Sequence, residues 1–155
     1  MKISLFFKTP APSNIKAKIK LLKTIAENTL KSIRNKNFET SIIFVNSAEI
    51  KKINKKFLKK TSITDVIAFN YPILEFESPE IPFGDVFVCL DQAKKQAETM
   101  KHSLLKELAI LTVHGCLHLK GMEDGTKDEK TEMDKKTGFY IRKHFPASKK
   151  SADKK

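Results

Sequence analysis

The stretch that decides the fold is LLKELAILTVHGCLHLKGMED, residues 104–124. From Leu104 to Leu119 it is apolar almost all round, which predicts a central helix buried inside the protein rather than lying on its surface. Two histidines, His114 and His118, interrupt this apolar helix near its end. Because they are four residues apart, their rings project from one helix face, close enough to share a small ion.

The residues after the helix extend this pattern. Gly121 suits the left-handed turn that ends a helix, and such a turn returns the chain, with Asp124, toward the two rings. The full pattern, His-x-x-x-His-x-x-Gly-x-x-Asp, is similar to the extended zinc motif in which a helix gives two ligands and the following loop the third. We therefore predict one divalent metal ion, zinc first, held by His114, His118 and Asp124, with water in the fourth position. Glu123 is the alternative oxygen ligand.

The alternative is that the two histidines are ordinary core or surface residues. Two histidines four residues apart often occur in proteins without binding a metal. Gly121 and Asp124 make the metal site the stronger interpretation. Cys116 points to a different helix face, so we predict a packing role for it. His102 and His144 have no ligand-like spacing to the site and are interpreted as surface residues.

The residue after His114 bears on the chemistry. Zinc proteases with a helix-borne histidine pair place a glutamate there as the general base, and this chain has Gly115. Proteolysis of that type is therefore disfavoured, and no side chain is assigned as catalytic. A metal ion with nearby cations suits the cleavage of a phosphodiester instead.

The charge of the chain favours an anionic partner. The formal net charge is +12, although nearly all basic residues are lysines, which indicates a compositional bias as well. Six lysines cluster between positions 51 and 60. We predict that this cluster binds RNA, against the alternative of a merely solvated lysine face. The RNA-binding candidates are Lys55, Lys56, Lys59 and Lys60.

Length and composition set the remaining bounds. A chain of 155 residues predicts a single domain, residues 1–145, followed by a lysine-rich disordered tail, residues 146–155. No apolar run approaches the roughly 20 residues needed to cross a bilayer, and the apolar start is too short for a secretory signal. We expect a cytoplasmic protein that does not interact with membranes and whose two cysteines are reduced.

The hydrophobic pattern alternates between strand-like and helix-like segments. Strands are predicted at Ile3–Phe7, Ser41–Val45, Val66–Phe69 and Val86–Leu90, with a proline-bearing loop at Tyr71–Pro82. Helices are predicted at Ile15–Ile33, Asn46 to about Lys56, Gln92–Lys101, Leu104–Leu119 and about Lys127–Lys143. The helix-capping candidates are Ser13, Asn46 with Glu49, Asp91, and Thr126 with Glu129.

Three blocks of this sequence resemble the YbeY-type endoribonucleases of bacterial ribosomal RNA maturation. The strongest block runs from His114 to Asp124, and the others are Thr64-Asp-Val-Ile-Ala-Phe69 and Gly84-Asp-Val86. The resemblance covers roughly residues 1–145. It implies an α+β fold, in which a small mixed sheet of about four strands packs against several helices and the metal site lies at the end of the buried central helix.

The resemblance also implies a function. It implies a zinc-dependent, single-strand-specific endoribonuclease in rRNA processing, acting in 16S rRNA 3′ end maturation and ribosome quality control. The implied partners are single-stranded ribosomal RNA and the ribosome or its small subunit, and we expect a monomer. Two alternatives stay open: a non-catalytic ribosome or RNA-binding maturation factor with a structural metal, and a metal-dependent hydrolase of another substrate.

This chain departs from the family pattern at two informative positions. The third histidine of the family falls at Asp124, which makes the site harder and more negative, so Mn²⁺ or another divalent ion is expected to compete with zinc. An arginine that the family needs for activity falls at Leu58. Lysine is no substitute for it, because an ammonium lacks the planar fork that arginine offers a phosphate.

Overall fold

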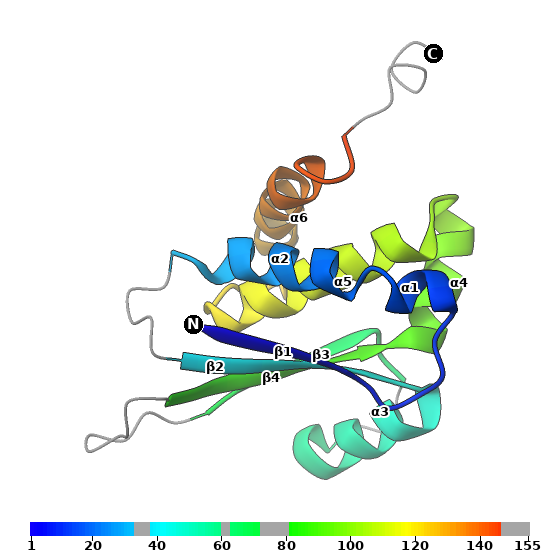
Figure 1. Ribbon diagram of the computed structural model, residues 1–155. Coiled ribbons are helices and arrows are strands. Elements are labelled where there is room, and N and C mark those ends of the chain that lie inside the picture. Colours follow the sequence, from blue (N-terminus) through cyan, green and yellow to red (C-terminus); the bar gives the residue numbers. More distant parts are fainter. Residues whose placement is uncertain (33–37, 60–62, 72–80, 147–155) are drawn as a thin grey trace.

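The computed structural model describes residues 1–32, 38–59, 63–71 and 81–146 (Figure 1). Four predictions fall wholly or partly outside these ranges: the end of the first helix at Ile33, Lys60, most of the loop at Tyr71–Pro82, and the tail after Pro146. The described elements, in chain order, are β1 (Lys2–Phe7), α1 (Ser13–Lys16), α2 (Ile19–Leu30), β2 (Phe38–Val45), α3 (Ser47–Ile53), η1 (Asn54–Leu58), β3 (Val66–Asn70), β4 (Ile81–Cys89), α4 (Leu90–Met100), α5 (Leu104–Leu119) and α6 (Lys127–Arg142).

The four strands form one mixed sheet in the order β1-β2-β4-β3. β1 pairs with β2 and β2 with β4 in parallel, whereas β3 pairs antiparallel with β4. β3 therefore lies at one edge of the sheet. The α+β class and the small mixed sheet predicted from the sequence are confirmed.

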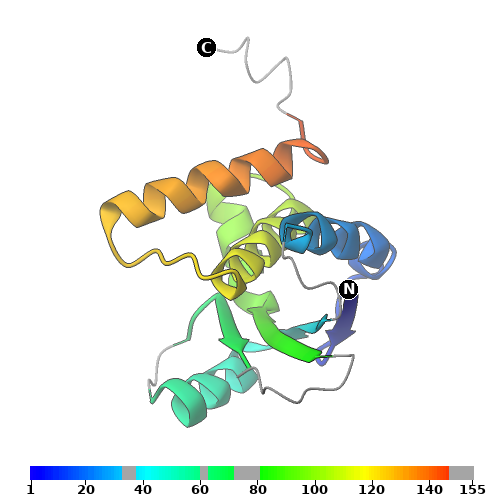
Figure 2. The same ribbon diagram turned by 90° about the vertical axis from the view of Figure 1, so that its left-hand side faces the viewer.

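Helices cover both faces of the sheet. Figure 1 shows α2 and α5 on one face and α3 on the other, and Figure 2 shows α6 lying across α5 on the side away from the sheet. The alternation along β2 explains the layering: Ile42 and Phe44 enter the core under α2 and α5, while Ile43 and Val45 enter a smaller core under α3.

α5 is the buried helix that the sequence predicts. Leu108, Leu111, Val113 and Leu117 are at most 1% exposed. The helix begins at the predicted boundary, where the Ser103 side chain accepts a hydrogen bond from the Lys106 N–H. At Gly115 an added Cβ would lie 2.3 Å from Val86 Cγ1, so the glycine lets α5 approach β4 closely.

Several predicted boundaries were wrong. The first helix is broken after Lys16, and Ser13 is its first residue rather than its cap. The hydrophobic pattern could not reveal the break, because Ile15 and Leu22 are both fully buried across it. The helix that begins at Ser47 changes at Asn54 into one wide π-helical turn.

The strands also differ from the prediction at their ends. β2 begins at Phe38, three residues early, and β4 begins at Ile81 and ends at Cys89. Pro82 therefore belongs to a strand, opposite Glu39 and beside a register irregularity, where proline is tolerated.

The predicted helix caps are partly confirmed. Thr126 and Glu129 form a complete capping box, and Asn46 accepts from the Glu49 N–H as expected. Asp91 was wrongly assigned. Its carboxylate accepts from the Ser47 N–H at 2.8 Å, so it caps α3 instead of its own helix.

No helix in the described ranges has the length and apolar character needed to span a membrane.

Candidate metal centre and cleft

The chain reverses direction immediately after α5. Gly121 has a φ of +100°, its N–H donates to the His118 carbonyl at 2.9 Å, and the Met122 N–H donates to the Leu117 carbonyl at 3.0 Å. These two bonds form a Schellman motif, which needs a residue with positive φ at the glycine position. The predicted role of Gly121 is confirmed, and the turn brings Asp124 back toward the helix.

His118 is held in one tautomer by this turn. Its Nδ1 lies 2.9 Å from the Met122 carbonyl oxygen, and since a carbonyl only accepts, Nδ1 carries the proton. The other ring nitrogen, Nε2, lies 3.6 Å from Asp124 Oδ2. A ring nitrogen bonded to a backbone carbonyl is the usual support of a metal-ligating histidine.

His114 lies one turn earlier, in a more enclosed place. Burial lowers the pKa of its imidazole, against the opposing effect of Asp65 and Asp134. His118 lowers the pKa of His114 slightly and Asp124 raises it, so the three predicted ligands lie within electrostatic reach of one another. A lowered pKa keeps the ring neutral at neutral pH, which is the form that binds metals.

The donor types fit a divalent ion, because two neutral imidazoles and a carboxylate are the common ligands of zinc. The geometry is partly formed. His118 and Asp124 lie together, but no three His, Cys, Asp or Glu side chains within the described ranges are arranged to hold a metal. Metal binding by His114, His118 and Asp124 therefore stays a prediction.

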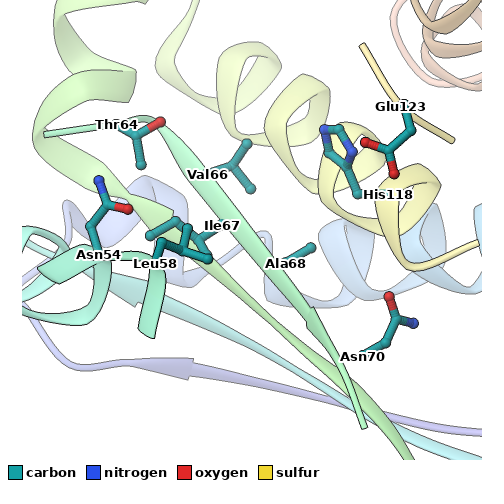
Figure 3. A pocket seen from close by; sticks show the side chains of 9 residues that line it. All are labelled: Asn54, Leu58, Thr64, Val66, Ile67, Ala68, Asn70, His118 and Glu123. Atoms are coloured by element: carbon teal, nitrogen blue, oxygen red, sulfur yellow. The ribbon is translucent and has the colours of Figure 1, made fainter. Parts of the chain in front are cut away.

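A cleft of about 440 Å³ opens beside His118 (Figure 3). Residues of β3 line it between two flanks, η1 on one side and the end of α5 with the following turn on the other (Figure 3). Glu123, the alternative oxygen ligand, points into this cleft next to the His118 ring (Figure 3). The lining residues are Asn54, Leu58, Thr64, Val66, Ile67, Ala68, Asn70, His118 and Glu123.

Leu58 stands where the family resemblance implies an arginine. Leu58 lines the cleft that also contains His118, and its side chain is 43% exposed. The neighbouring Lys59 has a φ of 56°, and its backbone N–H bonds to the Asn54 carbonyl to end the π-helical turn.

Three of the four predicted RNA-binding lysines fall within the described residues, and they lie on and just after the same turn. Lys55, Lys56 and Lys59 are exposed, and the described residues offer none of them a carboxylate within 4.0 Å. The Lys56 ammonium lies 5.3 Å from the centre of the Phe57 ring. These three charges therefore remain available to an external anion beside the cleft.

Several polar residues around α5 were not predicted from the sequence. Asp65 lies in a quoted motif but was given no role, and Asp134 of α6 reaches His114 from a distant part of the chain, which spacing cannot reveal. Asn70 donates from its side chain to the Leu119 carbonyl at 2.9 Å and so ties β3 to the end of α5.

The prediction that His102 is a surface residue was wrong. Its side chain is only 16% exposed, and its Nε2 lies 2.6 Å from the Glu107 carboxylate. Glu107 is itself buried and also accepts a hydrogen bond from Gln96 at 2.7 Å. Cys116 is fully buried as predicted, and burial raises the pKa of its thiol to about 12.

Fold and site together define a class: α+β proteins in which a buried helix carries a histidine pair and places the second histidine, His118, at a cleft beside the edge of a mixed sheet. Comparison with known proteins gives the family. The sequence model of the family Endoribonuclease YbeY matches residues 8–144. The chain belongs to this family.

Individual relatives agree. The chain is 44% identical over 143 residues to Endoribonuclease YbeY of Elusimicrobium minutum, covering 92% of this chain and 99% of that protein. It is 42% identical over 103 residues to Endoribonuclease YbeY of Bacillus licheniformis, covering 61% and 65% of the two chains. A Thermotoga maritima protein solved in solution matches the fold with a TM-score of 0.58 and 25% identity, covering 97% of this chain and 95% of that one.

Proposed function

We propose that this protein is an endoribonuclease that cleaves single-stranded RNA with one divalent metal ion held by His114, His118 and Asp124. Its family membership supports the enzyme class, the hydrolysis of RNA. The observation that supports the metal-dependent part is His118, which lines the cleft: its Nδ1 is fixed by the Met122 carbonyl, and its Nε2 lies 3.6 Å from Asp124 Oδ2.

The chain's own residues have separate tasks in this proposal. Lys55, Lys56 and Lys59 attract the phosphate backbone to the η1 side of the cleft, and His118 and Asp124 mark the end where the reacting phosphate lies. When bound, a divalent ion supplies Lewis-acid polarisation of the phosphodiester and activation of water. Zinc is the first choice, and the carboxylate of Asp124 also suits Mn²⁺.

Peptide hydrolysis is the less favoured use of this ligand set. Gly115 occupies the position of the protease glutamate, and Val86 leaves no room for a side chain there. The glycine thus has a packing reason to be present, and no carboxylate replaces it at that position.

The natural substrate is proposed from the family resemblance: ribosomal RNA in the cytoplasm, at the 3′ end of 16S rRNA, with the small ribosomal subunit as partner and a role in ribosome quality control. Mapping the ends produced when the purified protein acts on precursor 16S rRNA, free and in small subunits, tests this substrate. Uniform degradation of both, without a preferred end, would contradict it.

The central test compares wild type with His118→Ala and with His144→Ala on a single-stranded RNA, with the bound metal measured in each protein. His144 is a matched histidine in the segment after α6, where its ring lies 3.5 Å from the Asn28 amide nitrogen. We expect His118→Ala to lose the bound metal and to cleave RNA at least about a hundredfold more slowly, because removing one group that stabilises a transition state typically has an effect of that size. Equal cleavage by wild type and His118→Ala would refute the proposal. Metal binding with no cleavage would favour a non-catalytic RNA-binding factor.

A further inference from the structure

The hydrogen-bond pattern between β3 and β4 shows which groups of β3 face outward. The Cys89 N–H donates to the Asp65 carbonyl at 2.8 Å, so residues 65 and 89 are a hydrogen-bonded pair. In an antiparallel ladder such pairs alternate with non-bonded ones. The register pairs Val66 with Val88 and Ala68 with Val86, so the N–H and C=O groups of Val66 and Ala68 point away from β4.

These outward groups have no partner in the described part of the protein. β3 is the last strand of the sheet, and no hydrogen bond within the described residues reaches the main-chain N–H or C=O of Val66 or Ala68. An edge of this kind is a row of donors and acceptors that is ready to pair with another molecule.

The open edge faces the cleft that contains His118. Thr64, Val66 and Ala68 line the cleft on the β3 side, and Figure 3 shows the strand running past His118 and Glu123. Whatever pairs with β3 therefore lies directly beside the proposed metal centre.

The η1 side of the cleft offers the apolar Leu58 beside the polar Asn54, and its surroundings are basic. Leu58, 43% exposed, lines the cleft from η1, and Phe57 beside it is 56% exposed. Exposed apolar side chains interleaved with lysines are typical of surfaces that bind single-stranded nucleic acid. The three lysines of this turn favour a polyanion over an extended peptide, which would otherwise be the usual partner of a sheet edge.

We propose that the open edge of β3 at Val66 and Ala68 binds the hydrogen-bonding edge of one unpaired nucleobase, next to the scissile phosphate, with Leu58 packed against the base. This inference rests on the proposed function and adds a subsite to it. It also gives a physical cause for single-strand specificity. A base within a duplex has already used its Watson–Crick edge, so only an unpaired base can offer it to the strand.

Amide exchange followed by NMR tests the main-chain contact. The full-length His114→Ala protein is used so that the RNA stays intact, and the probe is a short oligouridylate. We expect the amides of Val66 and Ala68 to exchange fast in the free protein and to become protected with RNA. The amides of Ile67 and Phe69 face β4 and serve as internal controls, protected in both states. No change at Val66 and Ala68 when the RNA is bound overturns the proposal, as does protection by an extended peptide instead of RNA.

A double-mutant cycle tests the contact with the base. Binding is measured for the oligouridylate and for a series of the same RNA in which one base is missing, at a different position in each member. Each RNA is tested with the His114→Ala protein and with the protein that carries both His114→Ala and Leu58→Ala. We expect one position at which loss of the base weakens binding by about tenfold. The same loss has a much smaller effect in the Leu58→Ala protein. Phe139→Ala on α6, which removes a similarly exposed apolar side chain, leaves the effect of the missing base unchanged.

The outcomes separate this inference from the proposed function. If wild type cleaves RNA with metal but the base and Leu58 contribute independently, the base subsite is refuted and the nuclease proposal stands. If wild type does not cleave but the cycle shows coupling, the subsite stands and catalysis is refuted. Absence of any RNA binding refutes both.

Discussion

Asp124 is the predicted ligand position at which this chain departs from the three-histidine pattern that the family resemblance implies. Its carboxylate lies 3.6 Å from His118 Nε2 and is half exposed. Replacement by histidine adds a softer nitrogen donor, so we expect Asp124→His to bind zinc about tenfold more tightly, roughly 1.4 kcal/mol, and to bind Mn²⁺ less well. Competition with a zinc-sensitive fluorescent chelator measures the change.

The control for that prediction is the neighbouring carboxylate. Glu123→His places an imidazole at the alternative ligand position, which also faces the cleft. If Glu123→His tightens zinc binding and Asp124→His does not, the oxygen ligand is Glu123.

Tyr71 gives a prediction on pH. Its hydroxyl donates to the Asp85 carboxylate; this hydrogen bond, with burial and the negative charge, raises the pKa of Tyr71 to about 12. A raised pKa favours the protonated form in the folded state, so this contribution to stability is present below the ordinary pKa of about 10 and is lost as pH rises through about 12.

Asp85→Asn should therefore bring the pKa of Tyr71 back toward about 10. The chain has two tyrosines, so the measurement uses a Tyr140→Phe background in which only Tyr71 contributes phenolate absorbance. An unchanged titration in Asp85→Asn would show that the carboxylate is not the cause.

The sequence predicted those site residues whose positions follow from the local geometry of the chain. The histidine pair follows from helix periodicity, and Gly121 follows from the demands of the turn. The contacts of Asp65, Asp134 and His102 depend on how separate helices and strands pack, and no short-range spacing encodes that packing. The predicted convergence of His114 with His118 and Asp124 stays a prediction.

The two helical glycines of α5 and α6 should respond in opposite ways to alanine. In Gly115→Ala the new Cβ meets Val86 Cγ1 at 2.3 Å, deep in the core, so we expect a loss of about 1–3 kcal/mol in the free energy of unfolding. In Gly138→Ala the nearest atom is the end of the flexible Arg142 side chain, which can move, so better helix propensity should add up to about 1 kcal/mol.

Chemical denaturation of the metal-free proteins measures both changes. Gly115→Ala should also weaken metal binding, because a shift of α5 away from β4 moves both histidines. A Gly115→Ala protein as stable as wild type would mean that α5 adjusts its distance from the sheet at little cost.

Helices and strands were predicted where apolar periodicity is strong, and their limits were missed where tertiary contacts set them. α5 was predicted at its observed bounds because its apolar run and its cap agree. The π-helical turn at Asn54 leaves no mark in the periodicity, and the early start of β4 depends on pairing with β2 across a register irregularity. Asp91 could not be assigned from sequence, because its partner Ser47 lies in another helix.

The distribution of charge over the molecule predicts how RNA binding depends on salt. If Lys55, Lys56 and Lys59 each contact a phosphate, replacing all three by glutamate should make the slope of log affinity against log salt shallower by about 2. A matched control replaces the exposed Lys127, Lys135 and Lys136 of α6, a helix that lies on the side of α5 away from the sheet (Figure 2), and changes the net charge equally.

Fluorescence anisotropy over a range of salt concentrations measures both slopes. We expect the control to bind somewhat more weakly through the loss of overall charge, while keeping a slope close to that of wild type. Equal slopes for the two variants would mean that RNA responds to the net charge and not to the η1 lysines.

The strand order of the sheet also affects how the protein folds. β3 and β4 are the two strands that follow each other directly in the chain, whereas β1 and β2, and β2 and β4, must meet across intervening helices. Closing the shorter connection costs less entropy, so the β3–β4 hairpin is the part of the sheet that can form first. Mutations in this hairpin should then mainly slow folding, and mutations in β1 should mainly speed unfolding. The wall of the cleft would thus be built before the helix that carries the histidines docks onto it.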